Sequence, residues 1–194
     1  MDRSNFPNRL ALRGDLLDFS AEPGWGEVDS SALRFRPDHW LLIENGRIKG
    51  VQAAEPDAGW PRCEHRGRLI LPGFIDTHVH MPQLDVIASY GTELLDWLET
   101  YTFPAETAFA DPQRAQAGAE LFVDALLAHG TTSAVAFATA HKVSAEALFG
   151  AAQRRGMRML TGKVLQDRHS PDGLRDDVVQ AERDCVDQIG RAHV

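Results

Sequence analysis

The sequence has little cysteine and no long apolar run, and both absences narrow the class of protein. Cys63 and Cys185 are the only cysteines among 194 residues. Two isolated thiols make no disulfide framework, which indicates a reducing compartment. No window approaches the roughly 18 apolar residues of a membrane span, and the first twenty residues lack an uninterrupted apolar core typical of a signal peptide. These absences predict a cytoplasmic protein with no membrane partner.

An excess of basic residues is also missing. The chain carries 28 acidic and 20 basic residues, a formal net charge of -8, and the acidic residues are spread along it. This balance provides no electrostatic footprint for nucleic acid or for an acidic membrane surface. The composition, 43% hydrophobic and 25% charged, is that of an ordinary globular protein. We therefore expect a small-molecule partner and no nucleic acid.

Residues 1–66 are predicted to form a small β domain. The segment 10–19 is predicted to be the first strand. The segment 40–51 has two apolar runs separated by Asn-Gly, a strong hairpin signal because both residues tolerate the positive φ of a type I′ turn. Residues 53–67 are rich in turn formers and are expected to form a loop.

From Leu69 onward the pattern changes to strands that alternate with helices. The predicted strands are 69–75, 131–138 and 157–165, and 191–194 resembles the start of a fourth. The predicted helices are 93–99, ending near Pro104, a long one from Asp111-Pro112 to Gly130, 144–155 and 174–189. Such alternation indicates right-handed crossovers and a parallel sheet.

The parallel sheet has two possible completions, a small open sheet or part of a (β/α)8 barrel. A barrel takes roughly 250 residues, and about half that number follows Leu69. An open sheet would need a covering element after its last strand, which this sequence does not supply. We therefore predict an α/β protein: an incomplete (β/α)8 TIM-type barrel, about its first half, over residues 67–194. On this prediction the chain is the N-terminal fragment of a longer protein.

The stretch LPGFIDTHVHMPQ, residues 71–83, carries the main chemical signal. His78 and His80 are two apart on an extended segment and so point to the same side. They follow the first predicted parallel strand, where α/β folds place their active sites. Two converging imidazoles suit Zn²⁺, although zinc sites use three or more protein ligands. Asp76 could orient a histidine or cap the strand end. The alternative is a pair of solvated loop histidines.

Further ligands must come from elsewhere, and the other histidines are the candidates. His129 lies in the last turn of a predicted helix, where the dipole already favours a cation. His141 and His169 follow the second and third predicted strands and would either line the pocket or be plain loop residues. His39 and His65 fall in the small domain without a partner pattern.

PGFIDTHVH resembles the first-strand signature of the amidohydrolase superfamily. Its members are metal-dependent hydrolases with a (β/α)8 barrel and a small β-sandwich domain built from both chain ends. The strings THVHMPQ, LLDWLETYTFPAE, GTTSAVAFAT and TGKVLQDR resemble the guanine deaminases within it. The likeness covers most of the chain after residue 69 and departs from the common pattern at Gln166. It implies that residues 1–66 are the N-terminal part of the β-sandwich.

The resemblance also implies site residues. His78 and His80 match the first two ligands of one zinc ion per complete site. Gln83 matches the glutamine that holds the purine, and the adjoining His80, Met81 and Pro82 are placed in the same substrate-binding segment. The family's later parts have no counterpart in this sequence: two histidines, an aspartate, an acid/base glutamate and an Arg-Phe pair.

The implied reaction is hydrolytic deamination of guanine to xanthine and ammonia by a cytoplasmic homodimer. The acid/base residues are expected beyond Val194, so the chain alone is expected to be inactive. Trp97, Tyr101 and Phe103 would either stack on the purine or pack in the core. The alternatives are an amidohydrolase that acts on another aminated heterocycle or a cyclic amide, and a non-catalytic truncated product. A phosphate-binding βα protein would need a Gly-rich loop.

Overall fold

The computed structural model describes residues 7–24 and 30–189, and the chain divides into two compact units, Met1–Pro72 and Gly73–Val194. The predicted fourth strand, 191–194, lies outside the described residues. Within the described ranges, no helix is both long enough and apolar enough to cross a membrane.

The first unit is built on a four-stranded sheet with the order β3-β2-β1-β4. Its strands are β1 (Arg9–Phe19), β2 (Leu33–Glu44), β3 (Arg47–Gln52) and β4 (Arg62–Ile70). The Asn-Gly turn joins β2 to β3 with φ values of 52° and 73° at its two residues, which confirms the predicted hairpin. Trp40, Ala11 and Leu42 form a buried cluster against Trp60.

The strand β4 corrects the expectation that residues 53–67 form a loop. It pairs in parallel with β1, and seven of its nine residues are exposed. A strand that buries so little carries no apolar alternation, so its sequence offers no strand signal. It ends at Ile70, and the predicted strand 69–75 is therefore two segments. The predicted domain boundary between residues 66 and 67 falls inside β4, whereas the boundary between the two compact units lies after Pro72 in the sequence.

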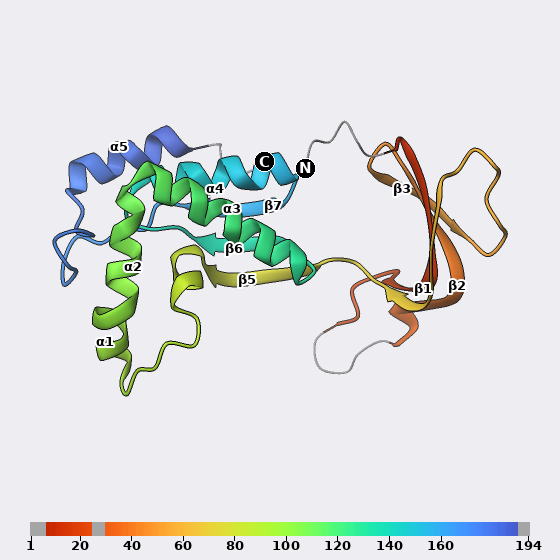
Figure 1. Ribbon diagram of the computed structural model, residues 1–194, viewed down its shortest axis with the longest axis horizontal. Coiled ribbons are helices and arrows are strands. Elements are labelled where there is room, and N and C mark those ends of the chain that lie inside the picture. The colour runs from red at the N-terminus through yellow and green to blue at the C-terminus, as the bar shows by residue number, and fades with distance from the viewer. Residues whose placement is uncertain (1–6, 25–29, 190–194) are drawn as a thin grey trace. The chain divides into compact units, whose positions relative to one another are not determined.

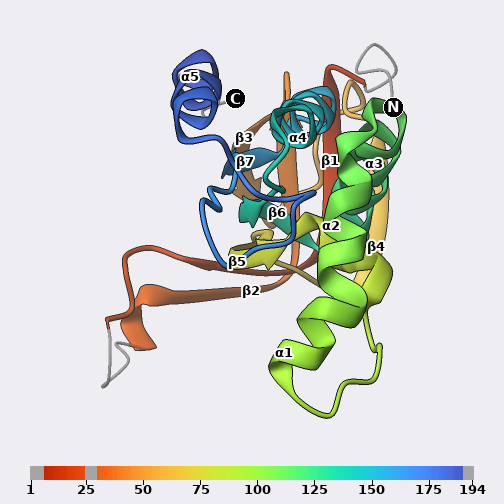
Figure 2. The same cartoon turned by 90° about the vertical axis from the view of Figure 1, so that its left-hand side faces the viewer.

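The second unit contains a parallel sheet with the order β5-β6-β7, as the alternating pattern predicted. The strands are β5 (Phe74–His80), β6 (Thr131–Phe137) and β7 (Arg158–Gly162). Helices α3 (Pro112–Ala128) and α4 (Lys142–Arg155) pack together along one face of this sheet (Figures 1 and 2). Ala134 and Ala136 of β6 are buried in the core cluster with them, whereas the alternate residues Val135 and Phe137 are exposed. The helix α5 (Val178–Gln188) follows β7 after a long loop.

The start of α3 was predicted correctly. Asp111 is the N-cap residue, and its side chain accepts a hydrogen bond of 2.9 Å from the backbone N–H of Gln113. Pro112 occupies the first helical position, where its missing N–H costs nothing.

The helical segment before α3 is longer than expected. It runs through α1 (Leu94–Trp97), the π-helical turn η4 (Leu98–Thr102), α2 (Phe103–Thr107) and the 3-10 turn η5 (Ala108–Ala110). Pro104 was expected to end it, because a proline clashes with the carbonyl four residues earlier. Here the backbone N–H of Phe103 bonds to the carbonyl of Leu98, five residues back. We attribute the passage of the helix through Pro104 to this wider turn.

Gly73 explains why the apolar run of the 71–83 stretch is interrupted. A Cβ atom at this position would lie 2.1 Å from Oγ1 and 2.7 Å from Cβ of Thr132. We expect Gly73→Ala to lower the free energy of unfolding by about 1–3 kcal/mol, the usual cost of overpacking. Gly162→Ala is the control, because a Cβ there meets no atom within 4 Å. Urea unfolding of both variants measures the difference, and equal stabilities would contradict the steric explanation.

Candidate metal centre

His78 and His80 converge at the C-terminal end of β5. Their Nε2 atoms lie 3.3 Å apart, and the ring centroids 5.0 Å apart. Two imidazoles on one tetrahedral zinc, each with an N–Zn distance of about 2.0–2.1 Å, place their nitrogens about 3.3–3.4 Å apart. The pair therefore fits two ligands of a single zinc ion. Both histidines are among the last three residues of the strand itself, whereas they were predicted to lie just past its end.

A bulge in β5 sets the direction of these side chains. Asp76 pairs with Ala134 and Val79 with Ala136, so β5 uses one residue more than β6 over this stretch. The Oδ1 atom of Asp76 accepts a hydrogen bond of 3.0 Å from the backbone N–H of His78. This bond holds the backbone of His78 inside β5, so it is not the expected cap at the strand end. Bulges of this kind commonly re-aim side chains next to active sites.

Phe137 is a third member of the cluster that the sequence did not reveal. It is the register partner of His80, and the two rings stack at 4.7 Å with an angle of 12°. His78 meets the same phenyl ring edge-on at 5.3 Å. The only signal was the position of Phe137 at the end of a predicted strand, since strand register cannot be deduced from one sequence.

The two histidines open onto a cavity of about 650 Å³. This volume lies within the usual range of small-molecule sites. Gln83, from the 3-10 turn η3 (Met81–Val86), lines the same cavity, and so does His129. The structure thus places Gln83 on the same cavity as His78 and His80, and a substrate contact by Gln83 stays a prediction.

Met81 and Pro82 are not brought to this cavity. Both side chains are almost completely buried, and Met81 belongs to the core cluster under the sheet. They anchor η3 to the core, so the structure offers no support for a substrate contact by either side chain.

Burial lowers the pKa of His80, and the neighbouring His78 lowers it further. Both effects favour the neutral imidazole, which is the form that binds a metal ion. Among residues 7–24 and 30–189, no group of three or more His, Cys, Asp or Glu residues is arranged to hold a metal. Within the described residues, His78 and His80 are thus a pair of candidate ligands without a third beside them.

Of the remaining histidine candidates, His129 borders the cavity of the pair and His169 lies elsewhere. The exposed His129 sits at the C-cap of α3, where its Nδ1 lies 2.8 Å from the carbonyl of Ala125. His169 lines a different cavity together with Phe103, and Trp97 donates its Nε1–H to the hydroxyl of Ser89 at 2.7 Å. Tyr101, like Phe103 and Trp97, does not line the cavity of His78, so stacking on a purine there stays a prediction.

A buried carboxyl group, Glu106, was also missed by sequence reasoning. It lies on α2 with 8% of its surface exposed. Burial raises the pKa of Glu106, while a hydrogen bond with the Gln166 side chain acts in the opposite direction. A buried glutamate within an amphipathic helical segment leaves no pattern that distinguishes it from an exposed one.

The raised pKa of Glu106 predicts a pH-dependent stability difference. The folded state keeps this proton to a higher pH than the unfolded chain, so the stability present at low pH is lost as the pH rises through the folded pKa. Glu106→Gln keeps a neutral group of the same shape and is expected to raise the Tm at pH 7 and leave it unchanged at pH 4. Thermal unfolding at both pH values measures this, with exposed Glu99→Gln as the control. A lower Tm for Glu106→Gln at pH 7 would contradict the account.

Comparison with known proteins agrees with the geometry. The Amidohydrolase family model matches residues 69–193. Guanine deaminase of Escherichia coli (strain K12) is 40% identical over 94% of this chain, which spans 43% of that relative. Guanine deaminase of Dictyostelium discoideum is 42% identical over 63% of this chain and 28% of the relative. The chain therefore spans less than half the length of these relatives.

Solved structures show the same likeness. The E. coli guanine deaminase structure superposes with a TM-score of 0.87 at 38% identity, covering 94% of this chain and 43% of that one. Guanine deaminase from C. acetobutylicum, solved with bound guanine in its active site, gives a TM-score of 0.76 at 29% identity, with 91% and 41% covered. Since the family model matches well over half of its residues and the paired histidines lie within the match, this chain belongs to the amidohydrolase family.

Proposed function

We propose that the full-length protein is a guanine deaminase, which hydrolyses guanine to xanthine and ammonia. The observation that carries the proposal is the joint placement of the His78–His80 pair and Gln83 around one cavity. Relatives named guanine deaminase at 40% and 42% identity support it.

The family implies a divalent metal ion, and we propose zinc, held by His78, His80 and ligands beyond the described residues. When bound, such an ion would supply Lewis-acid activation and lower the pKa of a bound water molecule toward about 7. Asp76 holds the backbone of the first ligand, and Phe137 supports the ring of the second. The three parallel strands, on this proposal, are the first part of a (β/α)8 barrel, and the first unit is part of a β-sandwich.

Gln83 is proposed to select the base. A primary amide both donates and accepts hydrogen bonds, so it can pair with a purine edge. A site that pairs polar groups in this way strongly rejects analogues that lack them, whereas shape alone discriminates weakly. The homodimer and the cytoplasmic location stay predictions from the resemblance and the composition.

The test is ammonia release by the full-length protein, supplied with zinc, from guanine, adenine, cytosine and a pterin. The proposal expects guanine to have the highest kcat/KM. Preferred turnover of another heterocycle would support the alternative of a different amidohydrolase. Release from none of them would contradict the proposal.

A further inference from the structure

The turn that leads from β6 into α4, residues 139–142, is fixed by hydrogen bonds to each of its backbone carbonyl groups. Its four successive carbonyl groups each accept a hydrogen bond, and the N–H of His141 donates to Oγ1 of Thr139 at 3.2 Å. The donors are, in chain order, Val164 N at 3.0 Å, Lys163 Nζ, Ser144 N at 3.0 Å and Gln188 Nε2 at 3.2 Å.

Lys163 is the charged part of this arrangement. Its side chain is 1% exposed, and its ammonium donates to Ala140 O and pairs with Asp176, whose side chain is 11% exposed. The other oxygen of Asp176 accepts the backbone N–H of Gln166 at 2.8 Å. The pair thus connects the loops that follow β6 and β7. Sequence reasoning missed it, because the two residues are 13 positions apart in a loop region.

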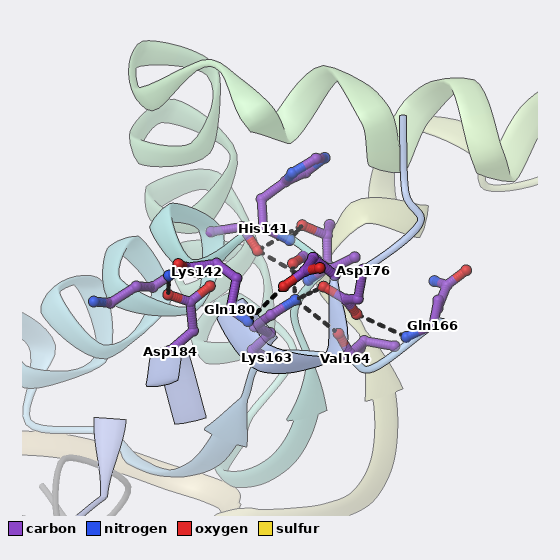
Figure 3. Close-up of polar contacts among 12 residues, drawn as sticks. His141, Lys142, Lys163, Val164, Gln166, Asp176, Gln180 and Asp184 are labelled. Atoms are coloured by element: carbon purple, nitrogen blue, oxygen red, sulfur yellow. Dashed lines mark hydrogen bonds and ion pairs between the residues drawn. The ribbon is translucent and has the colours of Figure 1, made fainter. Parts of the chain in front are cut away.

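The side chain of His141 stands in contrast to its backbone. Its Nε2 atom is buried and has no hydrogen-bond partner among the described residues. Figure 3 shows the imidazole directed away from Lys163 and Asp176, on the side of the C-terminal ends of the strands. Buried polar atoms are almost always paired in folded proteins, so an unpaired one on this side indicates a partner that is bound during function.

The surroundings of His141 also favour the neutral form of its imidazole. Burial lowers the pKa of His141, the Lys163 ammonium lowers it further, and Asp176 partly opposes this. A neutral imidazole offers one donor and one acceptor nitrogen, which suits the polar edge of a heterocyclic base.

We infer that His141 contacts the heterocyclic substrate through its ring nitrogen, and that Lys163 and Asp176 are positioning residues that hold it there. This inference rests on the proposed function. On this account His141 contacts the substrate and is not a metal ligand, a distinction that the zinc content of His141→Ala measures. The contact adds a polar group to those that Gln83 offers the substrate.

The experiment is a double-mutant cycle in the full-length protein, with His141→Ala, Lys163→Met and both together. We expect His141→Ala to lower kcat/KM for guanine about tenfold or more with the zinc content unchanged. Lys163→Met should cause a comparable loss, and the double variant should lose little more than either single one, since the lysine acts through the histidine. Asp176→Asn, which preserves the shape, should give a smaller loss of the same kind.

Lys142→Met is the matched control, because Lys142 is the sequence neighbour of His141 but pairs at the surface with Asp187 at 2.9 Å. It should leave kcat/KM unchanged. A second readout is the imidazole ¹⁵N resonance of His141, which should shift when xanthine is added to the wild-type protein but not when it is added to Lys163→Met.

Two outcomes would overturn the inference: full activity in His141→Ala, or losses in the two single variants that multiply in the double variant. Misfolding of Lys163→Met would show in circular dichroism, and Asp176→Asn together with the ¹⁵N measurement would then decide. An inactive wild-type protein would contradict the proposed function. An active wild-type protein whose His141→Ala variant is equally active would contradict only the inference about His141.

Discussion

Replacing His78 by alanine in the full-length protein is expected to remove the proposed zinc ion and the proposed guanine deaminase activity together. The Nε2 atoms of His78 and His80 lie 3.3 Å apart, the separation of two ligands on one tetrahedral ion. Without one of them, the remaining ligand set cannot hold the metal. Because a metal contributes several kcal/mol to the transition state, we expect kcat/KM to fall at least about 100-fold.

Atomic absorption and an ammonia assay on the same sample measure both losses. His129→Ala is the matched control, because His129 lines the same cavity but caps α3 through the carbonyl of Ala125. This control should keep its zinc. Full zinc occupancy in His78→Ala, or loss of zinc in His129→Ala, would show that the ligands had been assigned incorrectly.

Replacing Gln83 by alanine is expected to separate metal binding from substrate selection. Gln83 lies in η3, outside the metal pair, and borders the cavity into which the two histidines open. Its loss should leave the zinc content unchanged. The lost hydrogen bonds to the purine, about 1–3 kcal/mol, correspond to a fall in guanine kcat/KM of about 5- to 150-fold.

Steady-state kinetics with guanine, set beside the metal content, measure this effect. Gln116→Ala, on the exposed surface of α3, serves as the control and should behave as the wild type. Wild-type turnover by Gln83→Ala would remove this side chain from the substrate site, while leaving the metal assignment untouched.

The elements that the sequence predicted well carry local signals. The Asn-Gly turn lies between apolar runs and forces its own hairpin, and Asp111-Pro112 begins α3 through a side-chain cap. The paired histidines were found for the same reason, since residues two positions apart on an extended strand point to the same side.

The features that were missed depend on contacts between distant segments. The strand β4 forms because it can pair with β1, and its exposed residues carry no periodic signal. Phe137 meets His80 only through the register of two strands. The ion pair of Lys163 with Asp176 forms because the loop after β7 folds back on itself, and the Lys163 ammonium also reaches the carbonyl of Ala140 in the loop after β6. Such contacts cannot be deduced from one sequence.

Anomalous X-ray scattering at the zinc edge, from crystals of the full-length protein prepared without chelators, tests the central claim most directly. We expect one strong peak at about 2.0–2.1 Å from the Nε2 atoms of both His78 and His80. A fully occupied zinc peak that lies away from these two atoms, or no peak in crystals of an active enzyme, would contradict the account.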